Sequence, residues 1–262
     1  MKSYSALLVL MLLAGCSRSS NPQKPTAALR VLCGSSMAGP MRELGDRFKA
    51  LHGVEVEVDL GGSETLLPKI LAGAAADIFI CHDPFEQKVK EAGKWSGSSS
   101  VGVLQPVLLV RPGNPNQIET FDDLTNATLK LGIGDPRYST CGEMFVNRLD
   151  QKNIRLQVMN QVVLQARSHA EIANGLILGP LDAVVVWNFV ARLYTNKVEL
   201  VPTDDPYPDV KVTVVGLSSS PNPRLRDAFC ELCRTEAVKA LFEQHGYGAI
   251  KPVSKPKPPA VP

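Results

Sequence analysis

Short β-rich apolar runs alternate along this chain with stretches of helical apolar spacing, and this alternation constrains the fold most. We expect strands over residues 29–33, 54–60, 77–81, 102–111, 129–134, 161–165, 182–187 and 210–217. We expect helices over about 38–51, 64–73, 84–92, 140–151, 169–178, 223–229 and 234–245. Regular β-α alternation of this kind predicts an α/β fold, in which parallel sheets are flanked by helices.

Two of the expected strands are unusually long, and they bracket residues 112–209. They read VGVLQPVLLV (102–111) and VKVTVVGL (210–217). If each crosses between lobes, the chain builds one lobe, then a second, and returns to complete the first. This layout predicts a first lobe of residues 29–105 plus 212–250, a second lobe of residues 106–211, and a ligand cleft between them. We find no internal repeat in the sequence.

The N-terminus carries an apolar run that is too short to be a membrane span. Lys2 precedes the continuously apolar residues 6–14, and Cys16 follows two small residues. A spanning helix needs about 20 apolar residues, whereas this layout is typical of a secretory signal. The closing Leu-Ala-Gly-Cys resembles a bacterial lipobox, which implies cleavage before Cys16 and acylation of its thiol. The alternative is a plain signal peptide with a chance cysteine.

The segments at both ends of the mature chain are rich in proline and polar residues. We expect residues 1–15 to be a lipoprotein signal peptide, 16–28 a flexible tether, and 251–262 a disordered Pro-rich tail. The sequence therefore predicts an exported protein of the bacterial cell envelope or periplasm, held to a membrane by its lipid anchor.

The charge of the chain limits the classes of partner. A formal net charge of +2 offers no electrostatic basis for binding nucleic acid or a strongly charged macromolecule. We expect a monomer that binds a small molecule and that has no nucleic-acid partner.

Six cysteines are present, and one of them is assigned to the anchor. Five remain, so at least one thiol cannot pair within a monomer, and the sequence does not settle any pairing. Cys230 and Cys233 have the Cys-x-x-Cys spacing, but they lie in a stretch with helical apolar periodicity. We interpret them as buried helix cysteines in preference to a functional dithiol.

Four turns share one design, in which a strand ends, small or hydroxyl residues follow, and a helix begins. They are VLCGSSMAGPM with Ser35 and Ser36, VDLGGSETLLPKI with Ser63, LGIGDPRYSTCGEMF with Thr140 and Glu143, and QARSHAEIA with Ser168 and Glu171. We expect Ser63 to cap its helix, and the last two turns have the spacing of a capping box.

Helix N-termini offer unpaired backbone N–H groups and a partial positive charge, so several of them together can bind an anion without Lys or Arg. Each turn alone is explained by ordinary helix capping. Because there are two such turns in each predicted lobe, we favour a site for a small, fully ionised oxyanion.

The order of these segments resembles the periplasmic molybdate-binding proteins. The likeness is carried by GSSMAGPMRELGDRFKALHGVEVEVDLGGSETLLPKILAGAAADIFICHD, GDPRYSTCG, LDAVVVW, VLLVRPGNP and EAVKALFEQHGYG, within residues 29–248. The resemblance implies a two-lobed type II periplasmic-binding-protein fold, with a mixed sheet in each lobe. It also implies delivery of molybdate or tungstate to the permease of an ABC importer.

Carried over by position, the resemblance implies five ligand-binding residues. Ser36 and Ser63 would bind the oxyanion from the first lobe, and Cys141 and His169 would contribute backbone N–H groups from the second. Trp187 stands where the family has a tyrosine whose hydroxyl reaches the ligand.

Three residues depart from the family pattern. Trp187 can donate only through its indole N–H. Cys141 replaces a small alanine, and its thiol is expected to become more acidic at a helix N-terminus. Glu64 lies beside Ser63, so we expect its carboxylate to point away from a bound dianion.

Two alternatives remain open. One is a binding protein for another oxyanion or small polar solute. The other is a thiol-based metal carrier or redox protein that uses Cys33, Cys81 and Cys141, with His82 nearby. We see no nucleophile-base set and no dinucleotide motif, so we predict no enzyme, no cofactor and no site for a free metal cation.

Overall fold

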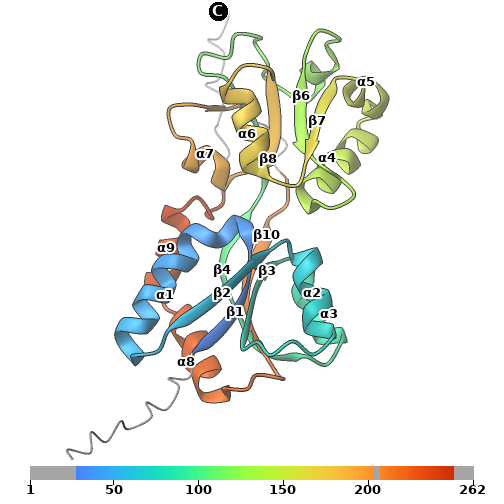
Figure 1. Ribbon diagram of the computed structural model, residues 1–262. Helices are drawn as coiled ribbons and strands as arrows, with labels where there is room; N and C mark the ends of the chain where they lie inside the picture. The colour runs from blue at the N-terminus through green and yellow to red at the C-terminus, as the bar shows by residue number, and fades with distance from the viewer. Residues whose placement is uncertain (1–27, 203–206, 251–262) are drawn as a thin grey trace, which may run out of the picture.

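The computed structural model describes residues 28–202 and 207–250, which form two β-sheets with helices packed on them (Figure 1). The predicted signal peptide 1–15, the anchor Cys16 and the tail 251–262 lie outside the described residues, as does the tether 16–28 apart from its last residue. Among the residues described, no helix has the length and apolar character needed to span a lipid bilayer.

The first sheet has the strand order β2-β1-β3-β10-β4. Its strands are β1 (Leu29–Gly34), β2 (Val56–Gly61), β3 (Ile78–His82), β4 (Trp95–Leu104) and β10 (Val210–Leu217). β1 pairs in parallel with β2 and β3, whereas β10 runs antiparallel to both β3 and β4. Its helices are the 3-10 turn η1 (Ser35–Met37), α1 (Ala38–His52), α2 (Ser63–Leu71), α3 (Phe85–Glu91), α8 (Pro223–Cys233) and α9 (Glu236–Gln244). Both C-terminal helices pack on this sheet.

The second sheet repeats this plan with the order β7-β6-β8-β5-β9. Its strands are β5 (Pro106–Val110), β6 (Leu131–Gly134), β7 (Val162–Ala166), β8 (Ala183–Trp187) and β9 (Glu199–Leu200). β6 is parallel to β7 and β8, and β5 is antiparallel to β8. Its helices are η2 (Asp122–Thr125), α4 (Thr140–Gln151), α5 (Arg155–Met159), α6 (His169–Ile177) and α7 (Phe189–Leu193).

Both sheets therefore contain a triplet of parallel strands followed by an antiparallel one, although the sequence shows no repeat. In each triplet the strands point their carboxyl ends toward the other sheet, and the chain then enters a helix or turn (Figure 1). This arrangement brings helix N-termini from both halves of the molecule to one interface. The predicted lobe limits, 29–105 plus 212–250 and 106–211, stay a prediction about the folding units.

The expected long strand over residues 102–111 is wrong, because the chain divides it at Gln105. The backbone N–H of Gln105 donates to Asn188 Oδ1 at 3.1 Å instead of joining a ladder. Its side-chain amide donates to the Tyr207 carbonyl at 3.1 Å and accepts from the Ile250 N–H at 2.9 Å. This buried glutamine thus links the junction between β4 and β5 to three segments that are distant in the sequence.

Several further elements differ from the sequence-based expectation, β4, α5 and α7 among them. β4 begins at Trp95, within a Gly/Ser-rich stretch of low strand propensity that is held by its pairing with β10. The short helices α5 and α7 were not predicted, because five residues carry too little periodicity to detect.

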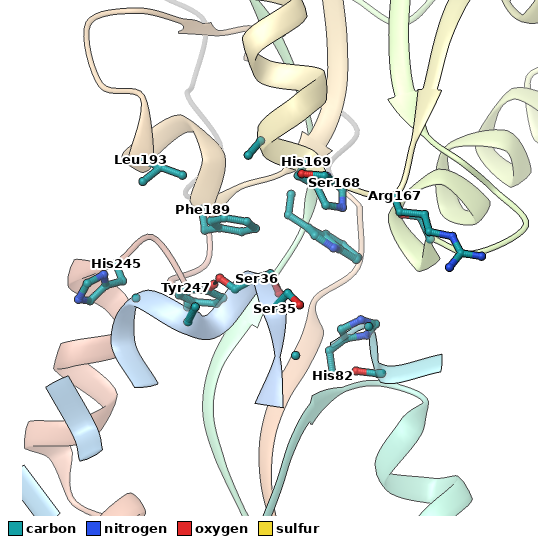
Figure 2. Close-up of a pocket in the computed structure, with 18 of the residues that line it drawn as sticks. Ser35, Ser36, His82, Arg167, Ser168, His169, Phe189, Leu193, His245 and Tyr247 are labelled. Atoms are coloured by element: carbon teal, nitrogen blue, oxygen red, sulfur yellow. Dashed lines mark hydrogen bonds between the residues drawn. The ribbon is translucent and has the colours of Figure 1, made fainter. Parts of the chain in front are cut away.

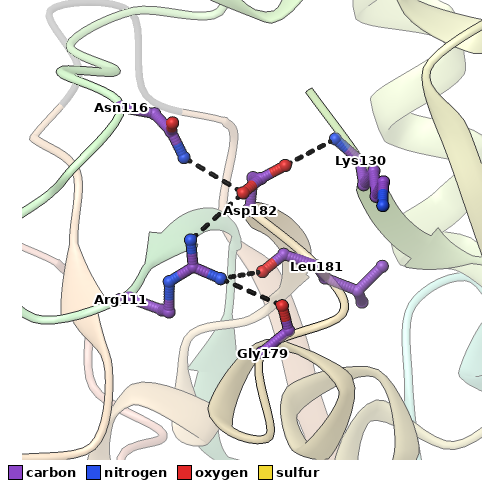
Figure 3. A network of polar contacts seen from close by, with 6 residues as sticks. All are labelled: Arg111, Asn116, Lys130, Gly179, Leu181 and Asp182. Carbon is purple, nitrogen blue, oxygen red and sulfur yellow. Dashed lines mark hydrogen bonds and ion pairs between the residues drawn. The ribbon is translucent and has the colours of Figure 1, made fainter. Parts of the chain in front are cut away.

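An aspartate stands before the central strand of each sheet, buried at Asp77 and partly buried at Asp182. Asp77 accepts from the Arg30 N–H at 2.8 Å and returns its own N–H to the Arg30 carbonyl at 2.9 Å. Asp182 makes the same reciprocal pair with Lys130, at 2.9 and 2.8 Å (Figure 3). Arg111 Nη2 also donates to Asp182 at 3.1 Å. Each carboxylate therefore fixes the register of two neighbouring parallel strands.

The described cysteines, Cys33, Cys81, Cys141, Cys230 and Cys233, are free and buried. The interpretation of Cys230 and Cys233 as buried helix cysteines is confirmed, because both lie in α8 with 7% and 0% exposure.

We predict that Asp77→Ala lowers the free energy of unfolding by about 3 kcal/mol, because it leaves buried donors without their charged acceptor. The donors are Arg30 N, Asn222 N at 3.1 Å and Ser220 Oγ at 2.6 Å. Urea unfolding measures the change.

The matched control is Asp150→Ala, which removes an aspartate whose side chain is 49% exposed and pairs with Arg155 at 3.0 Å. An exposed pair of this kind contributes less than about 1 kcal/mol. Equal losses in the two variants would contradict the proposed role of Asp77.

Candidate functional site

A cavity of about 890 Å³ lies where the carboxyl ends of the two parallel triplets face each other (Figure 2). Residues from both halves of the molecule line it, and they include Ser36, Ser63, His169 and Trp187 of the predicted site. Cys141 is not among these lining residues, although the two residues before it, Ser139 and Thr140, are. The structure thus brings four of the five predicted residues to one cavity and places the fifth beside it.

Ser63 is the first residue of α2 and does not cap it, which corrects the expectation. The N-cap is Gly62, one residue earlier, and no side chain accepts a hydrogen bond there. Ser63 is 3% exposed, and its Oγ has no hydrogen-bond partner among the described residues. A buried hydroxyl without a partner is costly, so a ligand oxygen is the natural acceptor for it.

Glu64 lies in the cavity wall, so the expectation that its carboxylate points away from the site is met only in part. The carboxylate lies over the backbone of Gly62, in the space that a Cβ at Gly62 would occupy. Its charge acts on His82 and favours the protonated form of that ring.

Ser36 lies in η1, directly after β1. The Tyr247 hydroxyl, from the segment that follows α9, donates to the Ser36 carbonyl. Gly34 precedes this turn, and a Cβ there would collide with the Met37 side chain. The C-terminal part of the chain therefore holds the first serine turn in place.

The turn after β6 is capped by a residue other than the one expected. Ser139, not Thr140, is the N-cap of α4, and its Oγ accepts from the Gly142 N–H at 3.3 Å. Gly142 lies so close to the Gly134 carbonyl that no side chain fits between them. This contact brings the first turn of α4, with its N–H groups, against the end of β6.

The predicted acidity of Cys141 is wrong, because burial raises the pKa of its thiol well above the ordinary value. The side chain is fully buried in the core between α4 and the sheet, and the thiolate would lose its hydration there. Only its backbone N–H, in the first turn of α4, remains a candidate ligand-binding group.

The fourth turn confirms its predicted cap. Ser168 is the N-cap of α6, and its Oγ accepts from the Glu171 N–H at 3.3 Å. His169 is the first helical residue, and its Nδ1 is buried without a hydrogen-bond partner within the described part of the chain. Burial and, to a smaller extent, the nearby His82 together lower the pKa of His169 to about 4.

His82 is a cavity residue that the sequence analysis left outside the oxyanion site. It ends β3, and its Nδ1 lies 2.7 Å from the Asp83 carbonyl, which can only accept, so Nδ1 carries the hydrogen. Burial lowers the pKa of His82. The signal that could have identified it is its position at a strand end, the same position that the serine turns occupy.

Trp187 ends β8 and lies between the two histidines. Its ring centroid is 5.8 Å from that of His82 and 6.0 Å from that of His169. The side chain is 3% exposed. That its indole N–H reaches a ligand stays a prediction.

The buried thiols are held in the protonated form. Burial raises the pKa of Cys33 to about 12 and that of Cys81 well above its ordinary value. Within the described ranges, no group of three or more His, Cys, Asp or Glu side chains is placed to hold a metal ion.

Comparison with known proteins gives a family match over most of the chain. The family described as bacterial extracellular solute-binding protein matches residues 29–248. The molybdate-binding protein ModA of Mycobacterium tuberculosis is 28% identical over 252 residues, which are 93% of this chain and 95% of ModA. A putative binding protein of Haemophilus influenzae is 23% identical over 222 residues, covering 84% of this chain and 91% of that protein.

Solved structures of binding proteins share the fold. The periplasmic molybdate-binding protein of Azotobacter vinelandii superimposes with a TM-score of 0.70 at 17% identity, covering 85% of this chain and 100% of that one. A periplasmic thiamin-binding protein gives 0.74 at 14% identity, covering 90% and 86%. The predicted family resemblance and the predicted periplasmic-binding-protein fold are both confirmed.

The depressed pKa of His169 predicts a pH-dependent stability of the ligand-free protein. Between the ordinary pKa of 6.5 and the folded value of about 4, the unfolded chain binds a proton that the folded chain does not. The free energy of unfolding therefore falls as the pH drops through this window, by about 2 kcal/mol at pH 5 from His169 alone.

Urea unfolding at pH 7.5 and pH 5 tests this prediction, with His169→Gln expected to lose less stability on acidification than the unmodified protein. The control is His52→Gln, which changes an exposed histidine at the end of α1, outside the cavity. If His169→Gln and His52→Gln respond to acid identically, His169 is not the titrating group.

Proposed function

The chain belongs to the bacterial extracellular solute-binding proteins, and we propose that it binds a tetrahedral oxyanion for an ABC importer. Members of this family bind a ligand to be transported, and they are not enzymes. Molybdate and tungstate are the first candidates, because ModA relatives align with this chain over 93% of its length.

The observation that carries the proposal is the buried hydroxyl of Ser63, a residue of the cavity wall, which has no acceptor within the described residues. The first turns of α2, α4 and α6 begin at the same cavity, and each adds backbone N–H groups and a partial positive charge. Uncharged donors gathered in this way can replace the hydration of a dianion without a buried Lys or Arg.

Each predicted residue then has a specific role. The Ser36 and Ser63 hydroxyls donate from the first sheet, and the backbone N–H groups of Cys141 and His169 donate from the second. The Trp187 indole N–H adds a donor where the family has a phenol. Because the donors belong to both halves, the ligand stabilises the closed arrangement over an open one.

We further propose that the exported protein is anchored at Cys16, acts as a monomer and delivers its ligand to a transporter permease. An acyl chain on Cys16 would keep the binding protein close to the importer. Another oxyanion is the main alternative ligand, since Trp187 and Glu64 change both the donor geometry and the charge at the site.

We predict that Ser63→Ala weakens molybdate binding about 5- to 150-fold, which corresponds to the roughly 1–3 kcal/mol of a hydrogen bond to a charged group. Isothermal titration calorimetry of the unmodified protein and the variant measures the change.

Ser99→Ala is the matched control, because the Ser99 hydroxyl is likewise buried and without a partner in the described chain but does not line the cavity. It should leave the affinity unchanged. Equal affinity of Ser63→Ala and the unmodified protein would remove Ser63 from the site.

Thermal shifts with molybdate, tungstate, sulfate, phosphate and divalent metals identify the class of ligand. Stabilisation by one or more oxyanions is expected from the donor set. Stabilisation by metals alone, abolished by alkylation of the thiols, would favour the metal carrier instead.

A further inference from the structure

Five aromatic rings form a continuous series of contacts along the cavity, and we call them the aromatic belt. They are His82, Trp187, His169, Phe189 and Tyr247, and all five line the cavity. Successive ring centroids are 5.8, 6.0, 6.4 and 5.4 Å apart, and the last pair, Phe189 and Tyr247, is stacked with an interplanar angle of 2°. Binding a small inorganic ion does not require contact with five aromatic rings.

The aromatic belt joins the two halves of the molecule. His82 and Tyr247 belong to the half built on the first sheet. Trp187 ends a strand of the second sheet, and His169 and Phe189 lie in helices that follow its strands. Beside the belt, Arg192 Nε donates to the Gln244 carbonyl at 3.1 Å. The halves are thus in contact along this side of the cavity.

The cavity is large for a bare oxyanion. Its volume is about 890 Å³. A tetrahedral ion has five heavy atoms and fills roughly 150 Å³ if each atom takes the share of one water molecule, about 30 Å³. Cavities of roughly 300–1,000 Å³ are typical of sites for organic molecules.

Aromatic rings have the wrong electrostatics for the ion itself. The face of each ring is electronegative, so it gains little from a dianion, whereas it packs well against apolar or planar groups. The donors at Ser36 and Ser63 suit the anionic part of a ligand, and the Phe189 end of the belt suits a part that carries no charge.

The part of the cavity that Phe189 lines has a further apolar residue in its wall. Leu193 follows Phe189 on α7, and it lines the cavity while 61% exposed. Figure 2 shows Phe189, Leu193 and His245 on the side of Ser36 opposite to His82 and Arg167. There is therefore room for a substituent that extends from the serine turns toward Leu193.

We propose that the cavity binds an oxyanion that carries an organic substituent, of the class of phosphate monoesters and phosphonates. The anionic group contacts Ser36 and Ser63, and the substituent lies along Phe189 and Leu193. This inference rests on the proposed oxyanion function and names its substrate class more closely.

Isothermal titration calorimetry of the unmodified protein with inorganic phosphate, phenyl phosphate and molybdate tests the inference. Phenyl phosphate is expected to bind at least about tenfold more tightly than inorganic phosphate, because the ring buries apolar surface that the ion lacks.

Two variants locate the substituent. Leu193→Ala and Phe189→Leu should weaken phenyl phosphate binding several-fold and leave inorganic phosphate binding unchanged. The matched control is Leu178→Ala, since Leu178 is an 81% exposed leucine of the same half that does not line the cavity. Because Leu193 is exposed, its replacement tests the wall without threatening the fold.

The outcomes separate the inference from the proposed function. If molybdate binds and phenyl phosphate binds no better than inorganic phosphate, the inference is overturned while the oxyanion function stands. Equal weakening of both phosphates by Leu193→Ala also overturns it. If no oxyanion binds, both fail.

Discussion

Everything at the candidate site depends on the direction of two triplets of parallel strands. In each sheet the three strands end at the same edge, and the chain must then turn into a helix or a short turn. The two edges face each other, so the helix N-termini of both halves meet at one cavity (Figure 1). Asp77 and Asp182 hold the register of these strands through reciprocal backbone contacts, and a slip in either register would displace the donors on that side.

The chemistry of the site follows from neutral donors in a partly desolvated space. Burial lowers the pKa of His82 and His169, so near neutral pH both rings are uncharged. Charge complementarity for an anion then comes from helix N-termini and hydroxyl groups, which need no counter-ion of their own. The same cavity is lined by the aromatic belt, whose Phe189 end is the part that we propose to contact an uncharged substituent.

The two halves share a topology without sharing a detectable sequence repeat. Their likeness lies in backbone hydrogen bonds and in the aspartate before each central strand, and many side chains satisfy those requirements. As a result, the turns after the parallel strands differ in where their serines lie relative to the helix start. Ser168 caps its helix as expected, and Ser139 caps one residue before the expected position. Ser63 is the first residue of its helix, and its hydroxyl has no partner in the described part of the chain. A shift of one residue changes whether a serine hydroxyl caps the helix or remains available to bind a ligand.

The sequence by itself determined the alternation of strands and helices, because this depends on local periodicity. It also carried the family resemblance, and the positions matched through that resemblance include four residues that line the cavity. Only the tertiary structure decided the break at Gln105, the raised pKa of Cys141 and the place of His82. These depend on burial and on contacts between distant segments, such as the Gln105 contacts with Asn188 and Tyr207. The aromatic belt has the same origin, since Phe189 and Tyr247 stack across the interface although 58 positions separate them in the chain (247 − 189 = 58).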